Sequence, residues 1–199
     1  GLAMNARADR LLAYAIFAGV LAAAGLPIYI HAPKYFVDEY GVSLAALGAV
    51  LFALRLLDVV QDPVLGWASR RFGAWRRGSV FVAAVVMALA MFGLFGVDPP
   101  IAPVAWFAVT LAFLFSAFSF LTITFYAQGV QKADVMGGSD GHVRLATWRE
   151  SGALIGISLA AVLPVALVPL TGAPFALFAM IFAGAVAIAV FAMRGEWHG

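Results

Sequence analysis

Six runs of about 20 mostly apolar residues follow one another along the chain, and they constrain its fold more than any other feature. The runs cover residues 11–32, 44–66, 79–97, 101–126, 145–170 and 173–193. A helix needs about 20 apolar residues to cross the hydrocarbon core of a bilayer. The breaks between the runs contain proline, glycine and charged residues, which are typical of connections. The sequence therefore predicts an all-α membrane protein whose single domain, residues 1–199, contains six transmembrane helices.

The composition agrees with a surface that faces lipid. Hydrophobic residues make up 64% of the chain and charged residues 11%, whereas a soluble domain is about 25% charged. The basic residues lie in short connections without interleaved aromatic residues, which argues against nucleic acid as a partner. Cysteine is absent, and the sequence contains no Ser–His–Asp set, phosphate-binding loop or metal motif. We therefore expect neither an enzyme nor a bound cofactor.

The basic residues in the connections predict the orientation of the helices. One side of the predicted bundle carries nine of them, and the other side carries only Lys34. The nine are Arg7, Arg10, Arg70, Arg71, Arg76, Arg77, Lys132, Arg144 and Arg194. Because cytoplasmic loops are enriched in lysine and arginine, both termini are expected in the cytoplasm, and the protein in the inner cell membrane.

Charged residues in the second and fifth runs are the candidates for function. The second run contains Arg55, Asp58, Gln61 and Asp62, and the fifth contains Arg149 and Glu150. The four residues of the second run share one stripe of a helix, because they stand at positions i, i+3, i+6 and i+7. Each triplet of runs thus has a charged middle member, which suggests a 3+3 inverted repeat. The topology places Arg149 level with Asp58 and Asp62, where we expect a cross-helix ion pair.

Two explanations are open for charges that each cost about 2.5–3.5 kcal/mol at the centre of a membrane helix. The charged groups could pair with one another and hold the bundle together. However, three acids and two arginines at one depth leave one negative charge in excess. An unbalanced carboxylate in a medium of low dielectric constant takes up a proton or binds a cation. The pattern therefore favours a site for a coupling ion, H⁺ or Na⁺.

The stretch LRLLDVVQDPVLGWASRRFGAWRR, residues 54–77, resembles a helix and loop motif of the glycoside–pentoside–hexuronide cation symporters. These are the melibiose-permease-like branch of the major facilitator superfamily. The stretches PIYIHAPKYFVDEYGVSLAALG and RLATWRESGALIGISLAAVLP support the resemblance. It implies the N-terminal six-helix half of a major facilitator fold. Its function would be symport of a sugar or other small organic solute with Na⁺ or H⁺ by alternating access.

The resemblance also implies roles for individual residues. Asp58, Gln61, Asp62 and Ser119 would bind the cation, and Arg149, Tyr126 and Thr122 would bind the substrate. Arg55 and Glu150 would complete the charge network, and Gly66, Arg70, Arg71 and Gly73 would form a gating loop.

The chain departs from the family pattern at four positions. Gln61 replaces the usual asparagine, which leaves the choice of ion open. Thr122 and Ala22 stand where the family has carboxylates, so a less hydroxylated or an anionic solute is expected. Arg70 replaces the aspartate of the gating motif, so closure of the gate must use another acid or be weaker.

Other functions remain open at this point. The chain could be a structural or assembly subunit, or an exporter or uniporter of a non-sugar solute. Transporters of this type have their site between two six-helix halves, so we expect the partner to be a missing C-terminal half or a second copy. Gly152 and Gly156 form a GxxxG pattern that predicts close helix packing. His31 is predicted to be solvated at the outer edge.

Overall fold

A computed structural model describes residues 2–198 of the chain, with side chains from residue 10 onward. The predicted position of the Arg7 side chain lies outside this described part. The elements are α1 (Leu2–Ala23), α2 (Leu26–Tyr40), α3 (Leu44–Arg71), η1 (Gly73–Trp75), α4 (Arg76–Phe95), α5 (Pro103–Val135), α6 (Ser139–Ala166) and α7 (Pro174–Ala192). Six helical segments are long and apolar enough to cross a membrane, and α1 and α2 together make the first. The all-α class and the six predicted spans are confirmed.

The first span is bent, whereas the sequence predicted one continuous helix over residues 11–32. α1 ends at Ala23 and α2 begins at Leu26. Pro27 explains the break, because proline lacks the N–H that a helix needs and disfavours helical backbone in the residue before it. The chain therefore turns at Gly25 before the helix resumes.

α2 continues to Tyr40, so the prediction of a loop after residue 32 is wrong. Its charged residues lie on the exposed side, where Lys34 Nζ and Asp38 Oδ2 are 2.6 Å apart. Phe36, on the opposite side, is completely buried. The segment is thus an amphipathic end of the helix, which a search for uniformly apolar runs does not detect.

Three helices extend beyond their predicted spans at one end of the bundle. α3 continues from residue 66 to Arg71, α5 from residue 126 to Val135, and α6 begins six residues early, at Ser139. The predicted spans cover only the apolar part of each helix, and the polar turns continue beyond it. As a result Asp62 lies nine residues, about 13 Å, from the end of α3, whereas the predicted span ended only four residues after it.

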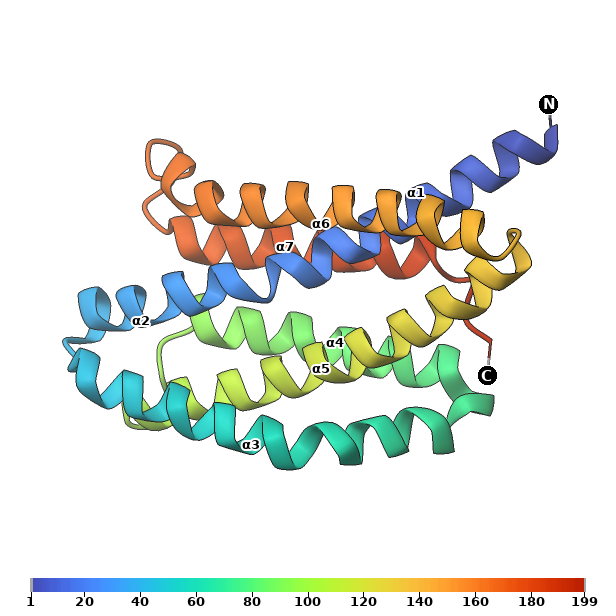
Figure 1. The fold of residues 1–199 in the computed structure, drawn as a ribbon. Helices are drawn as coiled ribbons and strands as arrows, with labels where there is room; N and C mark the ends of the chain where they lie inside the picture. Colours follow the sequence, from blue (N-terminus) through green and yellow to red (C-terminus); the bar gives the residue numbers. More distant parts are fainter. Residues whose placement is uncertain (1, 199) are drawn as a thin grey trace.

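The connections divide between the two ends of the bundle as the sequence predicts. Both termini, the α3–α4 connection and the α5–α6 connection lie at one end, at the right of Figure 1. We call this the basic end, because it carries Arg10, Arg70, Arg71, Arg76, Arg77, Lys132, Arg144 and Arg194. The other three connections lie at the opposite end, near Lys34.

The helix packing follows the predicted inverted repeat. α1 packs against α6, and the corresponding helices of the other triplet, α5 and α3, pack against each other. α4 packs against α5, and likewise α7 packs against α1. Exchanging the two triplets therefore exchanges one set of contacts for the other, as expected for a 3+3 inverted repeat.

Glycines bring the backbones of α1 and α6 into direct contact. A Cβ atom on Gly152 would collide with the carbonyl oxygen of Ala15, and one on Gly156 would collide with that of Gly19. The two contacts keep the same spacing along both helices, so α1 and α6 are parallel and in register. The close packing predicted from the GxxxG pattern is confirmed, and we call this contact the glycine seam.

His31 is buried, so the prediction that it is solvated is wrong. Its Nε2 lies 2.9 Å from the carbonyl oxygen of Ala160, and its ring stands edge-on to Phe175 and Phe178. The hydrogen bond joins α2 to α6 and satisfies a polar group that would otherwise be costly to bury. His31 therefore ties the bent first span to the rest of the bundle.

Candidate functional site

α3, which carries the predicted charged stripe, is joined to α5 by two sets of polar contacts. Gln61 Nε2 donates to Ser116 Oγ at 2.8 Å, and Ser116 Oγ donates to Gln61 Oε1 at 3.1 Å. About two turns further on, Ser69 Oγ and Thr124 Oγ1 are 2.7 Å apart. Both pairs are separated by 55 positions in the sequence, so α3 and α5 are also parallel and in register. We call this contact the polar seam.

A cavity of about 200 Å³ lies between α2, α3 and α5, and we call it the carboxylate cavity. Its polar lining consists of Tyr29, Arg55, Asp58 and Ser119. The Arg55 guanidinium carbon lies 4.8 Å from the centre of the Tyr29 ring, a cation–π contact. In the part of the chain that the structure describes, Asp58 forms no ion pair. Arg55, three residues earlier on α3, lines the same cavity but is not within ion-pair distance of this carboxylate.

Of the four residues predicted to bind the cation, the structure brings Asp58 and Ser119 together. Gln61 and Asp62 do not line the carboxylate cavity. The amide of Gln61 is held by Ser116 in the polar seam, and Asp62 is exposed one turn further along α3. The spacing on the helix placed the stripe correctly, but only part of it faces one cavity.

A smaller cavity, of about 130 Å³, lies between α1, α5 and α6, and we call it the arginine cavity. All three residues predicted to bind the substrate line it: Thr122, Tyr126 and Arg149. The Arg149 guanidinium carbon lies 4.4 Å from the centre of the Tyr126 ring. Arg149 Nε also donates to Glu150 Oε1 at 3.3 Å. The hydroxyl of Thr122 is buried without a hydrogen-bond partner among the described residues.

The structure does not contain the expected cross-helix ion pair between Arg149 and Asp58 or Asp62. Arg149 pairs with its neighbour Glu150 instead. The expectation failed because α5 packs against both α3 and α6 and contributes side chains to both cavities. The charges on α3 and α6 thus face different cavities.

Phe118 of α5 lines both cavities and forms the wall that they share. The sequence analysis did not identify it, because a phenylalanine in an apolar helix is indistinguishable from a packing residue. Ser116 was missed for a related reason, since hydroxyl groups on a membrane helix often bond to their own backbone. Ser119 was identified only through the family motif.

The residues of the predicted gating loop lie at the basic end, where Gly66, Arg70 and Arg71 belong to the last turns of α3 and Gly73 follows the helix. Gly66 is buried, and Arg70 Nη1 would lie 3.4 Å from a Cβ atom at that position. Arg70 and Arg71 are exposed, and Gly73 begins the short helix η1. Neither arginine has a carboxylate within ion-pair distance in the described part of the chain. The loop therefore supplies no acid of its own.

Glu196 is a nearly buried acid at the basic end that pairs with basic residues. It follows α7, and its carboxylate lies 3.2 Å from Lys132 Nζ on α5 and 3.8 Å from Arg10 Nε on α1. The expectation that closure uses another acid or is weaker stays a prediction, because Glu196 pairs with Arg10 and Lys132 and not with the gating-loop arginines. Nothing in the gating motif marks Glu196, because it lies far away in the sequence.

A second set of hydrogen bonds holds the same tail. Arg76 is buried and donates to Gln128 Oε1 at 3.2 Å and to the carbonyl oxygen of His198 at 2.7 Å. The backbone N–H of His198 donates to Gln128 Oε1 at 2.8 Å. We call Arg76, Gln128, Lys132 and Glu196 the basic-end network. It joins α4, α5 and the tail after α7 across one end of the bundle.

Comparison with known protein families gives a match over most of the chain. A family model described as MFS/sugar transport protein matches residues 12–195. No solved structure matches the chain. The matched region contains all six spans, both cavities and the two seams, and it confirms the resemblance stated from the sequence.

Proposed function

The chain belongs to the MFS/sugar transport protein family, and from this premise we propose that it serves in the cation-coupled symport of a small organic solute. Transport would proceed by alternating access, in which two six-helix units rock about a fixed site. The family is one of transporters, while the coupling ion, the symport mechanism and the solute are our proposals. They rest on the two cavities beside α5.

The observation that carries the proposal is that one aromatic side chain, Phe118, lies between the cavity that contains Asp58 and Arg55 and the neighbouring cavity that contains Arg149. Symport requires that a cation and a solute each bind and that each binding event affects the other. A shared wall provides such an effect without an ion pair between the two sites. This arrangement would be unusual in a subunit with a purely structural role, where charged groups are expected to neutralise one another.

We propose Asp58 as the main ligand of the coupling ion. Its carboxylate lies in the carboxylate cavity, together with the hydroxyl of Ser119, and forms no ion pair within the described residues. A carboxylate alone is sufficient for H⁺, whereas Na⁺ takes additional oxygen ligands. The amide of Gln61 could join such a set only if its bonds to Ser116 opened. The ion is thus H⁺ or Na⁺, and Asp62 is a second, more exposed acid on the same helix.

We propose that the solute presents hydrogen-bond acceptors to the arginine cavity. Arg149 supplies a charged donor, Tyr126 a ring face and Thr122 an unpartnered hydroxyl. Within the described lining, no carboxylate is present to accept bonds from a sugar's hydroxyl groups. Arginine binds carboxylates in a planar, two-bond geometry. An anionic or poorly hydroxylated solute therefore fits this lining better than a galactoside does.

We further propose that a second six-helix unit covers α3 and α6. These two spans are the least buried of the six, and they flank the helix that lines both cavities. The second unit is another part of the same polypeptide or a second copy of this chain. Lysine and arginine are enriched on the cytoplasmic side of membrane proteins. The basic end would therefore face the cytoplasm, with the protein in the inner membrane.

Uptake into proteoliposomes tests the proposal. We expect radiolabelled sugar acids or sugars to accumulate only when an inward Na⁺ or H⁺ gradient is imposed, and the gradient that works identifies the ion. Asp58→Asn should abolish gradient-driven accumulation but retain exchange of solute across the membrane, because only the coupling ion loses its ligand.

Asp98→Asn is the matched control. Asp98 is exposed in the α4–α5 connection and lines neither cavity, so accumulation should match the unsubstituted protein. Accumulation that is insensitive to both gradients and to Asp58→Asn would show that the protein is not a cation symporter.

A further inference from the structure

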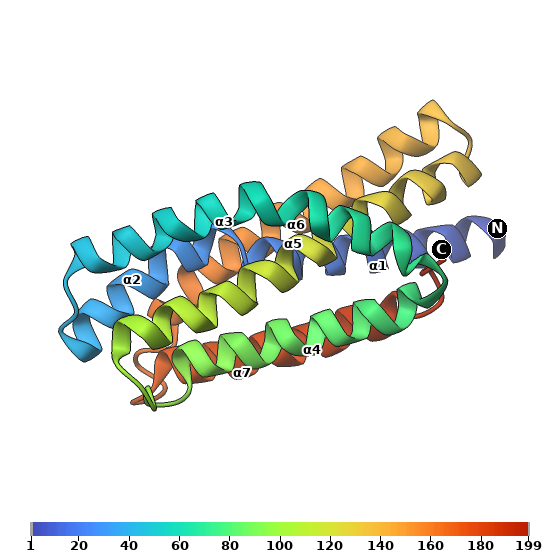
Figure 2. The ribbon, with the colours of Figure 1, turned by 90° about the horizontal axis from the view of Figure 1, so that it is seen from below.

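A long apolar groove runs between α4 and α7, on a face of the bundle away from both cavities. Figure 2 shows the two helices side by side along one edge. The groove has a volume of about 720 Å³, and apart from two arginines its lining is apolar. We call it the α4–α7 groove. Since it borders two membrane-spanning helices, its natural occupant is a molecule that is itself apolar along most of its length.

The groove has charge at one end only. Arg77, in the first turn of α4, and Arg194, just after α7, both line it at the basic end. Neither forms an ion pair in the described part of the chain. Glu196, the nearest acid in the sequence, is engaged by Lys132 and Arg10. The mouth of the groove is therefore positively charged and not neutralised.

Arg194 is held in place for binding. Its guanidinium carbon lies 3.9 Å from the centre of the Phe191 ring, and its Nη1 donates to the Phe191 carbonyl oxygen at 2.8 Å. A guanidinium has five N–H donors, so most of them remain available. Arginine binds phosphate through parallel pairs of such bonds.

The length of the groove matches one leaflet of a bilayer. Its lining on α4 extends from Arg77 to Ala88, and on α7 and the turn after it from Ala183 to Arg194. At 1.5 Å per residue each stretch is about 17 Å long, and half of the hydrocarbon core is about 15 Å thick. An acyl chain that starts at the arginines would end near the middle of the membrane.

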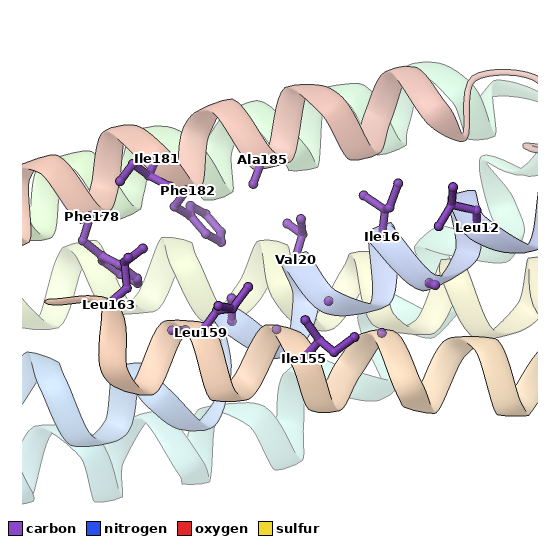
Figure 3. Close-up of a pocket in the computed structure, with 16 residues that line it drawn as sticks. Leu12, Ile16, Val20, Ile155, Leu159, Leu163, Phe178, Ile181, Phe182 and Ala185 are labelled. Atoms are coloured by element: carbon purple, nitrogen blue, oxygen red, sulfur yellow. The ribbon is translucent and has the colours of Figure 1, made fainter. Parts of the chain in front are cut away.

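We propose that the α4–α7 groove binds one anionic phospholipid from the leaflet at the basic end. An acyl chain lies between α4 and α7, and the phosphate is bound by Arg77 and Arg194. The charge at the mouth selects the anionic headgroup. A second groove, between α1, α6 and α7, provides an internal comparison, because its lining contains no charged residue (Figure 3). That groove should accept acyl chains without regard to the headgroup.

Native mass spectrometry of the purified protein, titrated with phosphatidylglycerol or with phosphatidylcholine of the same acyl chains, tests the proposal. We expect phosphatidylglycerol to bind more tightly. Arg77→Gln and Arg194→Gln should each weaken its binding about fivefold, the effect of one basic residue near an anionic lipid. Both substitutions should weaken the binding of phosphatidylcholine less, because its choline ammonium group offsets the charge of its phosphate. Arg144→Gln removes the same charge from an exposed site at the same end but outside the groove, and it should change neither lipid.

A second pair of variants tests the acyl-chain half of the site. Ala187 is exposed within the groove, so Ala187→Phe should fill it and weaken the binding of phosphatidylglycerol with both arginines intact. Ala161→Phe adds the same bulk at an exposed position of α6 outside the groove and should have no effect.

Three results would overturn the proposal. They are equal binding of the two lipids, an equal loss of phosphatidylglycerol binding in Arg144→Gln and Arg77→Gln, and unchanged phosphatidylglycerol binding in Ala187→Phe. A lipid-independent dimer that Ala187→Phe dissociates would instead identify the occupant as a second copy of the chain. None of these measurements depends on transport, so their outcome does not depend on whether the proposed symport is correct.

Discussion

At the scale of single residues, Thr122 has the least satisfied environment in the candidate site. Its hydroxyl lines the arginine cavity and has no hydrogen-bond partner among the described residues. A buried polar group without a partner destabilises a protein by about 1–3 kcal/mol. A solute that supplied the missing partner would recover this free energy on binding.

Replacing Thr122 with valine should therefore separate stability from function. The substitution keeps the shape and removes the unpartnered hydroxyl, so the melting temperature in detergent should stay the same or rise by about 2–4 °C. Solute binding should weaken about tenfold, because one bond to the solute is lost. Thermal unfolding and the KM for uptake measure the two effects.

Thr124→Val is the matched control, two residues further along α5. Thr124 bonds to Ser69 in the polar seam, so this variant should be destabilised by about 1–2 kcal/mol with an unchanged KM. If Thr122→Val lowered the melting temperature as much as Thr124→Val and left the KM unchanged, Thr122 would be a packing residue.

The sequence predicted individual site residues better than it predicted their partners. Asp58 and Arg149 stood out because charge is rare in a membrane helix, and each does line a cavity. Which partner each side chain meets depends on its direction around the helix axis. That direction changes by about 100° from one residue to the next. The predicted pair between the two charges therefore failed, and Phe118 was missed because it carries no chemical signal.

At the scale of helices, the glycine seam makes α1 and α6 a single unit. A methyl group at Gly152 or Gly156 would overlap backbone atoms of α1, which cannot move as the end of a flexible side chain can. The same helices carry Ala22 and Arg149 into the arginine cavity. The spacing between α1 and α6 therefore sets the width of that cavity.

Gly152→Ala and Gly156→Ala should each lower the free energy of unfolding by about 1–3 kcal/mol, the usual effect of overpacking. Both should also weaken solute binding, because the added methyl group pushes the helices apart. Chemical unfolding followed by circular dichroism, together with solute binding, measures these effects.

Gly184→Ala in α7 provides the comparison, since a Cβ atom there meets no atom within 4 Å. It should be neutral or stabilising by up to about 1 kcal/mol, because alanine favours helix over glycine. If Gly184→Ala lowered the free energy of unfolding as much as the seam variants do, general helix propensity, and not the close contact, would govern the effect.

The number of spans was predictable, but several helix ends were not. Hydropathy detects only the part of a helix that needs an apolar surface, so the polar turns of α3, α5 and α6 at the basic end were assigned to connections. The end of α2 was missed for the same reason. These extra turns matter for function because they carry Lys132 and Gln128 into the basic-end network.

At the scale of the whole molecule, the basic-end network closes one end of the bundle. Glu196 and Lys132 are both about 90% buried, and Arg76 and Gln128 are buried beside them. The network holds the tail after α7 against α4 and α5. Any movement of the tail away from α4 and α5 must break these contacts.

Glu196→Gln should destabilise the closed end, because it leaves the ammonium group of Lys132 buried without its partner. Loss of one member of a buried ion pair costs about 3–5 kcal/mol, which should lower the melting temperature by several degrees. Lys132→Gln combined with Glu196→Gln should recover most of that loss, because no unpaired charge remains. A double-mutant cycle of melting temperatures measures the coupling between the two residues.

The exposed pair of Lys34 and Asp38 is the internal control. Both side chains are more than half exposed, so Asp38→Asn should change stability by less than about 1 kcal/mol. A cycle that gave the same small coupling for Glu196 and Lys132 would show that the network does not hold the end closed.

The two seams give a symmetric bundle unequal stiffness. The inverted repeat relates the α1–α6 pair to the α3–α5 pair, yet the first is an interlock of backbone atoms and the second is held by side-chain hydrogen bonds. Interlocked backbone atoms resist sliding, whereas each side-chain hydrogen bond contributes only about 0.5–1.5 kcal/mol and can break singly. Conformational change within the bundle should therefore be largest along α3, the helix that carries Asp58. Topological symmetry in this protein does not imply mechanical symmetry.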